Sequence, residues 1–243
     1  MLKQALLATL SLSIALPAMA TDMGRISKRG QKAAAIINRM VESENNPDSA
    51  IPASLLNQAK CITVFPSMFK AALGPFSFGL GGARGKGLAS CRDTEGKWGA
   101  PAYVNVSAAS LGLQFGIQKI DMVLVYVGDD SMNELVHRNL SANLEAAATA
   151  GPIGRSATLG TSINFETGVY SYSHSRGLFA GVAIGGVTMS ADKKANKAVY
   201  GEESSPEQIL VKKASEAPDA ASDFLLALES KATEIDDSDD DKN

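Results

Sequence analysis

Residues 111–130 read LGLQFGIQKIDMVLVYVGDD and contain two runs that are typical of β-strands. Residues 111–118 and 122–127 are rich in large apolar side chains, and the Gly-Asp-Asp that follows is a turn signal. Similar runs predict further strands at residues 61–65, 88–92, 102–107, 162–173 and 178–190. Many short strands with tight connections indicate an antiparallel sheet. We therefore predict an α+β fold with a strongly curled, barrel-like antiparallel β-sheet and flanking N- and C-terminal helices.

Helical patterns lie on both sides of this strand-rich core, which we place at residues 61–201. Residues 22–58 carry apolar side chains at helical spacing, namely Ile26, Ala33, Ile36, Ile37 and Met40. Residues 205–230 return to helix after the start signal Ser-Pro-Glu. We predict that residues 22–230 form a single domain and that the acidic residues 231–243 form a disordered tail.

The first 20 residues are typical of a secretory signal peptide. Lys3 supplies the positive charge, residues 6–16 are apolar, and Ala18-Met19-Ala20 is a small-x-small cleavage site. We expect cleavage near Ala20 and a periplasmic or secreted protein, a location compatible with peripheral membrane association. The alternative is a buried N-terminal helix.

Export would place Cys61 and Cys91 in an oxidising compartment. Each lies in a predicted strand, and two cysteines there are more often bridged than free. A pair of buried free thiols is the alternative.

The composition argues against a disordered chain, a nucleic-acid-binding protein and a zinc protein. The chain has 243 residues, of which 45% are hydrophobic, and a net charge of −3. It can therefore bury a core, and it lacks the overall positive charge that favours nucleic-acid binding. The two histidines and two cysteines fill a four-ligand zinc site only if all four converge, so no metal site is predicted. The glycines cluster at residues 74–87 and 177–186, which favours bends and close backbone approach within a sheet.

Motif searches give no positive support for an enzyme. Residues 79–87 are glycine-rich but depart from a phosphate loop, because Gly87 stands where a hydroxyl should hold magnesium. Arg84 and Lys86 could still meet an anion there, although a glycine-rich turn is the favoured interpretation. The serine-nucleophile pattern G-x-S-x-G does not occur. We predict no catalytic residue and no cofactor.

The N-terminal helical segment is strongly basic. Five cations precede the first acid, Glu42, in the stretch that begins at residue 25: Arg25, Lys28, Arg29, Lys32 and Arg39. An amphipathic helix of this kind can lie on an anionic membrane surface. The alternative is an ordinary helix that covers the core and presents a solvated charged face.

Several segments in order resemble one known family. They are IP at 51–52, AKCITVFP at 59–66, GKG at 85–87, WGAP at 98–101, GLQFGIQ at 112–118, AGPIGR at 150–155, YSYSHSRGLFAG at 170–181 and NKAVYG at 196–201. This pattern resembles the SYLF domain, a lipid-binding module of exported bacterial proteins and of eukaryotic membrane-trafficking proteins. The resemblance covers residues 24–230.

The resemblance implies binding of anionic phospholipids, including phosphoinositides in eukaryotic members, and no established catalytic residues. Some eukaryotic relatives also bind actin filaments, which we do not expect beside an export signal. We assign lipid binding to Arg25, Lys28, Arg29, Lys32, Arg39, Arg84, Lys86 and Arg176. The alternative function is a structural or protein-interaction component of the cell envelope, with a possible envelope protein as partner.

The sequence departs from the family pattern at two positions. Cys61 stands where the family usually has glycine, which supports a bridge to Cys91 specific to this protein. His174 replaces a position that is usually arginine or lysine. The family pattern also makes residues 140–150 a strand, so we expect the helix that begins at Ser131 to end near Asn139.

Overall fold

A computed structural model describes residues 15–41, 50–73, 79–137, 168–201, 204–212 and 217–240. The helices are α1 (Ala15–Met40), α2 (Ala53–Gln58), α3 (Asp129–His137), α4 (Lys193–Tyr200), α5 (Pro206–Lys212), the 3₁₀ helix η3 (Asp219–Ala221) and α6 (Ser222–Asp240). The strands are β1 (Ala59–Leu73), β2 (Gly79–Cys91), β3 (Ala102–Val127) and β4 (Gly168–Ala191). No helix in this described part of the chain combines the length and apolarity needed to cross a membrane.

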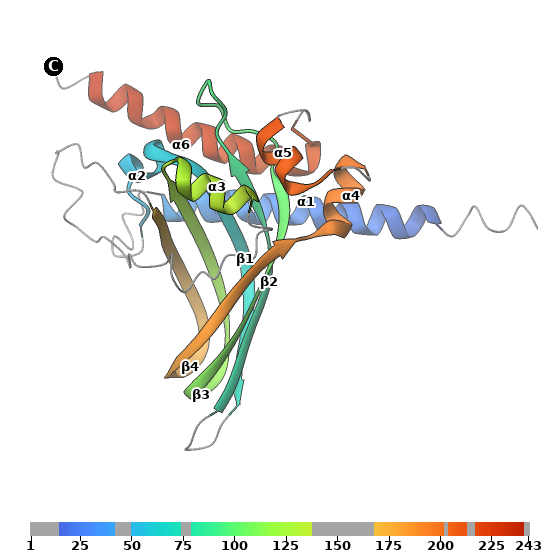
Figure 1. Ribbon diagram of the computed structural model, residues 1–243, viewed down its shortest axis with the longest axis vertical. Helices are drawn as coiled ribbons and strands as arrows, with labels where there is room; N and C mark the ends of the chain where they lie inside the picture. The colour runs from blue at the N-terminus through green and yellow to red at the C-terminus, as the bar shows by residue number, and fades with distance from the viewer. Residues whose placement is uncertain are drawn as a thin grey trace, which may run out of the picture.

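The sheet is antiparallel (Figure 1). The two longest strands, β3 and β4, each contribute two segments to it. β3 pairs with β4 along nearly its whole length, from Val104 opposite Ala191 to Val127 opposite Gly168. On its other edge, residues 102–112 of β3 pair with β2 and residues 116–127 pair with β1. The β1–β2 hairpin therefore lies between two halves of β3, and six strand segments lie side by side.

The predicted barrel-like curl is wrong, although the α+β class and the flanking helices are confirmed. The two outermost segments of the sheet are the two halves of β4, and the described residues contain no pairing between them. Closure of a sheet requires backbone pairing between its two outermost segments. The sheet is consequently open and not strongly curled.

The strands are also longer than predicted. Pro66 does not end β1, because it lies at a register shift where β1 bulges against both neighbouring strands. A bulge tolerates the missing N–H of proline, and the following Ser67 turns to a positive φ of 53°. Residues 111–118 and 122–127 likewise belong to one continuous strand, β3.

Helices cover both faces of the sheet near the end where β1 begins and where β3 both begins and ends (Figure 1). Ile37 of α1 and Phe224 of α6 belong to one buried cluster with Val64 and Val123 of the sheet. Leu135 of α3 and Ile209 of α5 belong to a second cluster. The helical spacing predicted for residues 22–58 is confirmed on α1, since Ile26, Ala33, Ile36, Ile37 and Met40 are all buried.

Helix α1 approaches η3 very closely at Gly30. A side chain at this position would collide with the carbonyl oxygen of Ala220. Gly87 has the same role within the sheet, because a Cβ there would collide with the carbonyl oxygen of Val64. The prediction that glycines of the cluster at residues 74–87 permit close backbone approach within the sheet therefore holds at Gly87.

The C-terminal helix extends further than the sequence suggests. α6 continues to Asp240, into the stretch that we expected to be a disordered tail. Its first half packs on the core through Phe224 and Leu228, and adding residues to a helix that is already established costs far less than starting one. The predicted end of the helix near Asn139 and the predicted strand at 140–150 lie outside the described residues.

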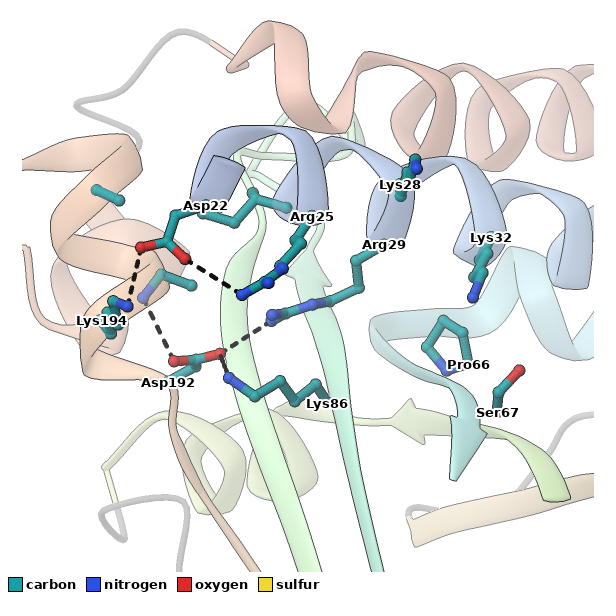
Figure 2. Close-up of a pocket in the computed structure, with 13 residues that line it drawn as sticks. Asp22, Arg25, Lys28, Arg29, Lys32, Pro66, Ser67, Lys86, Asp192 and Lys194 are labelled. Carbon is teal, nitrogen blue, oxygen red and sulfur yellow. Dashed lines mark hydrogen bonds and ion pairs between the residues drawn. The ribbon is translucent and has the colours of Figure 1, made fainter. Parts of the chain in front are cut away.

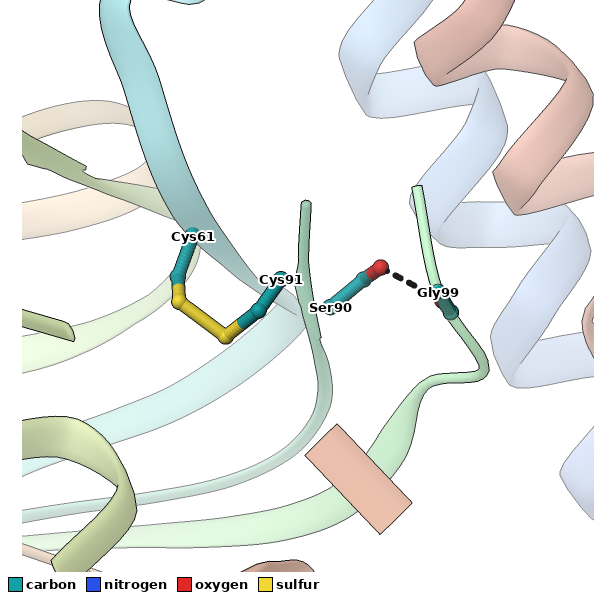
Figure 3. The surroundings of a disulfide bond; sticks show 4 residues. All are labelled: Cys61, Ser90, Cys91 and Gly99. Carbon is teal, nitrogen blue, oxygen red and sulfur yellow. Dashed lines mark hydrogen bonds between the residues drawn. A yellow bond between two sulfur atoms is a disulfide. The ribbon is translucent and has the colours of Figure 1, made fainter. Parts of the chain in front are cut away.

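Cys61 and Cys91 form a disulfide bond (Figure 3). They are direct partners in the β1–β2 register, so the bridge joins two paired strands near the helix-covered end of the sheet. Both side chains are buried. Next to the bridge, the Ser90 hydroxyl donates a 2.7 Å hydrogen bond to the carbonyl of Gly99 and ties β2 to the chain that leads into β3. The predicted bridge is confirmed.

A basic pocket between helix α1 and the sheet

One face of α1 is buried and the adjacent face is basic. Ile26, Ala33 and Ile37 lie in the core, whereas Lys28 and Lys32 are exposed. Arg29 lies at the boundary, with only 11% of its side chain exposed. Because residues three and four positions apart lie on the same side of a helix, these cations form a row along the seam between α1 and the sheet.

This seam opens into a pocket of roughly 550 Å³ (Figure 2). Its walls come from α1, the β1 bulge, β2 and the start of α4. Six basic and two acidic side chains line it: Arg25, Lys28, Arg29, Lys32, Lys86 and Lys194, with Asp22 and Asp192. Pro66 and Ser67 form part of the wall, so the bulge in β1 contributes directly to the pocket.

Asp192 organises the inner end of the pocket. Its carboxylate, only 5% exposed, accepts hydrogen bonds from Arg29 at 3.1 Å and Lys86 at 2.9 Å. It also caps α4 by accepting from the backbone N–H of Ala195 at 3.3 Å. Burial acts to raise the pKa of Asp192, but the Lys86 hydrogen bond, the Arg29 and Lys86 charges and the Ala195 N–H together lower it below its usual value.

Asp22 plays a similar part at the outer end. Lys194 lies 2.8 Å from its carboxylate and Arg25 lies 3.8 Å away. The hydrogen bond from Lys194, with the nearby positive charges, lowers the pKa of Asp22. Within the described residues, Lys28 and Lys32 have no such carboxylate partner. The pocket therefore retains an excess of positive charge that can meet an anion.

The pocket collects five of the predicted site residues: Arg25, Lys28, Arg29, Lys32 and Lys86. Arg39 and Arg176 lie elsewhere, where both pair with the buried carboxylate of Asp121 at 2.7 and 2.8 Å. The backbone N–H of Ser67 also donates to Asp121, at 2.7 Å. Arg84 is exposed on β2, two residues before Lys86 and on the same face of the strand.

Comparisons with a family model and with curated proteins point to one family. A family model described as Ysc84, Las17-binding protein actin regulator, matches residues 107–231. The chain belongs to the Ysc84 family. This confirms the family membership that the SYLF resemblance predicts.

Curated members of the Ysc84 family are similar to most of the chain. SH3 domain-containing YSC84-like protein 1 of Rattus norvegicus is 30% identical over 178 residues, which are 72% of this chain and 51% of that protein. Protein YSC84 of Saccharomyces cerevisiae is 30% identical over 209 residues, 83% of this chain and 43% of that protein. LAS seventeen-binding protein 3 of the same yeast species is 31% identical over 209 residues, 83% of this chain and 44% of that protein. The chain thus spans about half the length of these relatives or less, and no solved structure matches it.

The part of the chain that matches the Ysc84 family model includes Asp192 and Lys194 but not the pocket residues of α1 and β2. Sequence reasoning missed Asp22, Asp192 and Lys194. A signal for Asp192 was present, because an aspartate three residues before Ala195 and next to a helix-forming stretch is a typical N-cap. Nothing local indicates that the cap would also hold Arg29, since that contact depends on how distant segments pack.

Proposed function

We propose that this Ysc84-family protein is a non-catalytic module that binds anionic phospholipids, with the basic pocket receiving the phosphate of the headgroup. The observation that carries the proposal is the convergence of six cations from α1, β2 and α4 around one opening. Phosphate oxygens are strong acceptors for lysine and arginine donors. Each basic residue near an anionic membrane contributes about 1 kcal/mol of attraction.

Lys28 and Lys32 are the side chains best placed to meet the phosphate. Both are exposed and line the pocket, whereas Arg29 and Lys86 are engaged by Asp192. The latter two shape the inner wall, and their charges still add to the local positive potential. This division separates residues that contact the lipid from residues that position the wall.

The proposal places the protein outside the cytoplasm, in the periplasm or secreted, as a peripheral membrane protein. It is supported by the signal-like sequence up to Ala20 and by the Cys61–Cys91 bridge, since disulfides persist in oxidising compartments. α1 begins at Ala15 and crosses the predicted cleavage site, so cleavage after Ala20 would leave the pocket residues on the mature helix.

Vesicle co-sedimentation tests the proposal. We expect the protein to pellet with vesicles of phosphatidylcholine mixed with phosphatidylglycerol, and to remain in solution with phosphatidylcholine alone. Raising the ionic strength from about 0.01 M to about 0.15 M should weaken the binding, because the Debye length falls from about 30 Å to about 8 Å. Equal binding to both vesicle types, or none, would overturn it. Pelleting with actin filaments instead would favour the activity that the family description names.

A further inference from the structure

The sheet extends well beyond the helices at the end opposite to the helix-covered core (Figure 1). Six described side chains on the α1 face of the sheet characterise this region, which we call the distal end: Phe69, Leu80, Arg84, Ile117, Lys119 and Arg176. Lys86 and Asp121 mark the face that α1 covers, because Asp121 pairs with Arg39 of α1 and Lys86 shares its partner Asp192 with Arg29 of α1. Side chains two residues apart on a strand lie on the same face, so Arg84 lies on the face of Lys86 and Lys119 on the face of Asp121.

A row of cations crosses the distal end. Phe69 of β1 is the direct register partner of Arg84 on β2 and of Lys119 on β3. Lys119 in turn is the partner of Arg176 on β4. Four adjacent strands thus contribute Arg84, Phe69, Lys119 and Arg176 in one line, with the exposed aromatic ring between cations. Arg84 and Lys119 have no ion-pair partner in the described part of the chain.

Exposed apolar side chains lie beyond this row, further from the helices. Ile117 is 58% exposed and Leu80 is 72% exposed, while Phe69 within the row is 45% exposed. These account for three of the six large apolar side chains that are exposed among the described residues. The others, such as Leu226 of α6, lie on helices. Apolar groups gathered beside a charged rim indicate an interaction surface.

The spacing of the two layers matches a bilayer interface. Ile117 is two residues from Lys119, or about 7 Å along the strand, and Leu80 is four residues from Arg84, or about 13 Å. The headgroup region of one leaflet is roughly 5–8 Å deep. With the cations at the level of the phosphates, Ile117 and Leu80 therefore reach the acyl-chain boundary.

We propose that the distal end inserts into the interface of an anionic lipid bilayer, with Arg84 and Lys119 on the phosphates and Phe69, Leu80 and Ile117 below them, while Arg176 at the end of the row stays paired with Asp121. This inference rests on the proposed lipid-binding function and assigns the orientation of the protein on the membrane. A second copy of the chain fits the surface less well, because stacking two such faces would bring like charges together.

Glutamate substitutions test the insertion. Leu80→Glu and Ile117→Glu place a charge where the acyl boundary is expected, and Leu226→Glu makes the same kind of change at a 67% exposed leucine on α6. We expect each distal variant to bind phosphatidylglycerol-containing vesicles about tenfold more weakly or worse, and Leu226→Glu to bind as the wild type does. Thermal melts of all three variants check that folding is retained.

Bromolipid quenching gives a readout that does not depend on loss of affinity. A tryptophan introduced by Leu80→Trp should be quenched by lipids brominated on their acyl chains, whereas one introduced by Leu226→Trp should not. If the wild type fails to bind anionic vesicles, the proposed function itself is wrong. If the wild type binds but the Leu80→Glu and Ile117→Glu variants bind equally well and Leu80→Trp is not quenched, only the insertion is overturned.

Discussion

The guanidinium of Arg29 lies 3.1 Å from the carboxylate of Asp192, although 163 residues separate the two in the chain. The contact joins α1 to the first turn of α4, and Lys86 of β2 completes it from the sheet. Three elements that form the pocket are thus held by one buried carboxylate. The pocket geometry and the stability of the fold are consequently coupled at Asp192.

Replacing Asp192 with asparagine should affect stability and lipid binding in opposite directions. Asp192→Asn keeps an oxygen that can cap α4 but removes the charge that Arg29 and Lys86 share, so we expect a loss of about 1–3 kcal/mol in the free energy of unfolding. The pocket gains positive charge, and binding to anionic vesicles should tighten roughly fivefold. Urea denaturation and co-sedimentation measure the two effects. Asp130→Asn, at an exposed position of α3, is the control, and unchanged binding of Asp192→Asn would contradict the expectation.

The lowered pKa of Asp192 predicts acid sensitivity. A carboxyl group whose pKa is lower in the folded than in the unfolded protein stabilises the fold above its unfolded pKa, about 3.9, and that contribution is lost as the pH falls through the folded pKa. The unfolding free energy of the wild type should therefore decrease below about pH 4. Urea melts across this range should show a smaller decrease for Asp192→Asn. Parallel curves for the two proteins would contradict the assignment.

Loss of the disulfide should destabilise the protein without abolishing the sheet. The bridge closes a separation of 30 residues, which corresponds to about 3–4 kcal/mol in the chain-entropy description. We expect dithiothreitol, or the double substitution of Cys61 and Cys91 by alanine, to lower the urea midpoint accordingly. Dithiothreitol should have no further effect on the double variant, which controls for effects of the reagent itself. A wild-type midpoint that is insensitive to reduction would contradict the prediction.

Two glycines of α1 should respond oppositely to the same substitution. Gly30→Ala puts a methyl group against the carbonyl of Ala220 and forces α1 away from η3, which should cost roughly 1–3 kcal/mol. Gly24→Ala meets no atom within 4 Å and should stabilise the helix by about 0.5–1 kcal/mol. Thermal or urea melts of the two variants compare them directly. A stabilised Gly30→Ala would show that the close helix contact is not required.

The sequence was most informative where periodicity is local. The apolar face of α1 follows from the spacing of Ile26, Ala33 and Ile37, and all three are buried. The path of β1 through Pro66 could not be predicted in this way, because proline normally ends a strand and only pairing with β2 and β3 reveals the bulge. The openness of the sheet depends on whether its two outermost segments, the halves of β4, pair with each other, and strand propensity does not encode this.

The sequence also predicts only part of the site, because local spacing reveals the cations of one helix but not the contacts made by long-range packing. Arg25, Lys28, Arg29 and Lys32 occupy one helix and were found together, and Lys86 joins them through the sheet. Charge alone groups Arg39 and Arg176 with them, yet both pair with Asp121, a buried acid whose role depends on long-range packing. Counting cations along the chain could not separate those that face the pocket from those that neutralise a buried carboxylate.

Charge reversal at the pocket is the most direct test of the central claim, that the basic pocket binds anionic lipid. The double variant Lys28→Glu/Lys32→Glu changes two pocket residues, and Lys60→Glu/Lys97→Glu makes an equal change in charge at exposed lysines outside it. We predict that the pocket variant binds phosphatidylglycerol-containing vesicles at least roughly thirtyfold more weakly than the wild type, and that the control loses only a few-fold in affinity. Equal weakening of the two variants would contradict the account, because binding would then depend on net charge and not on the pocket.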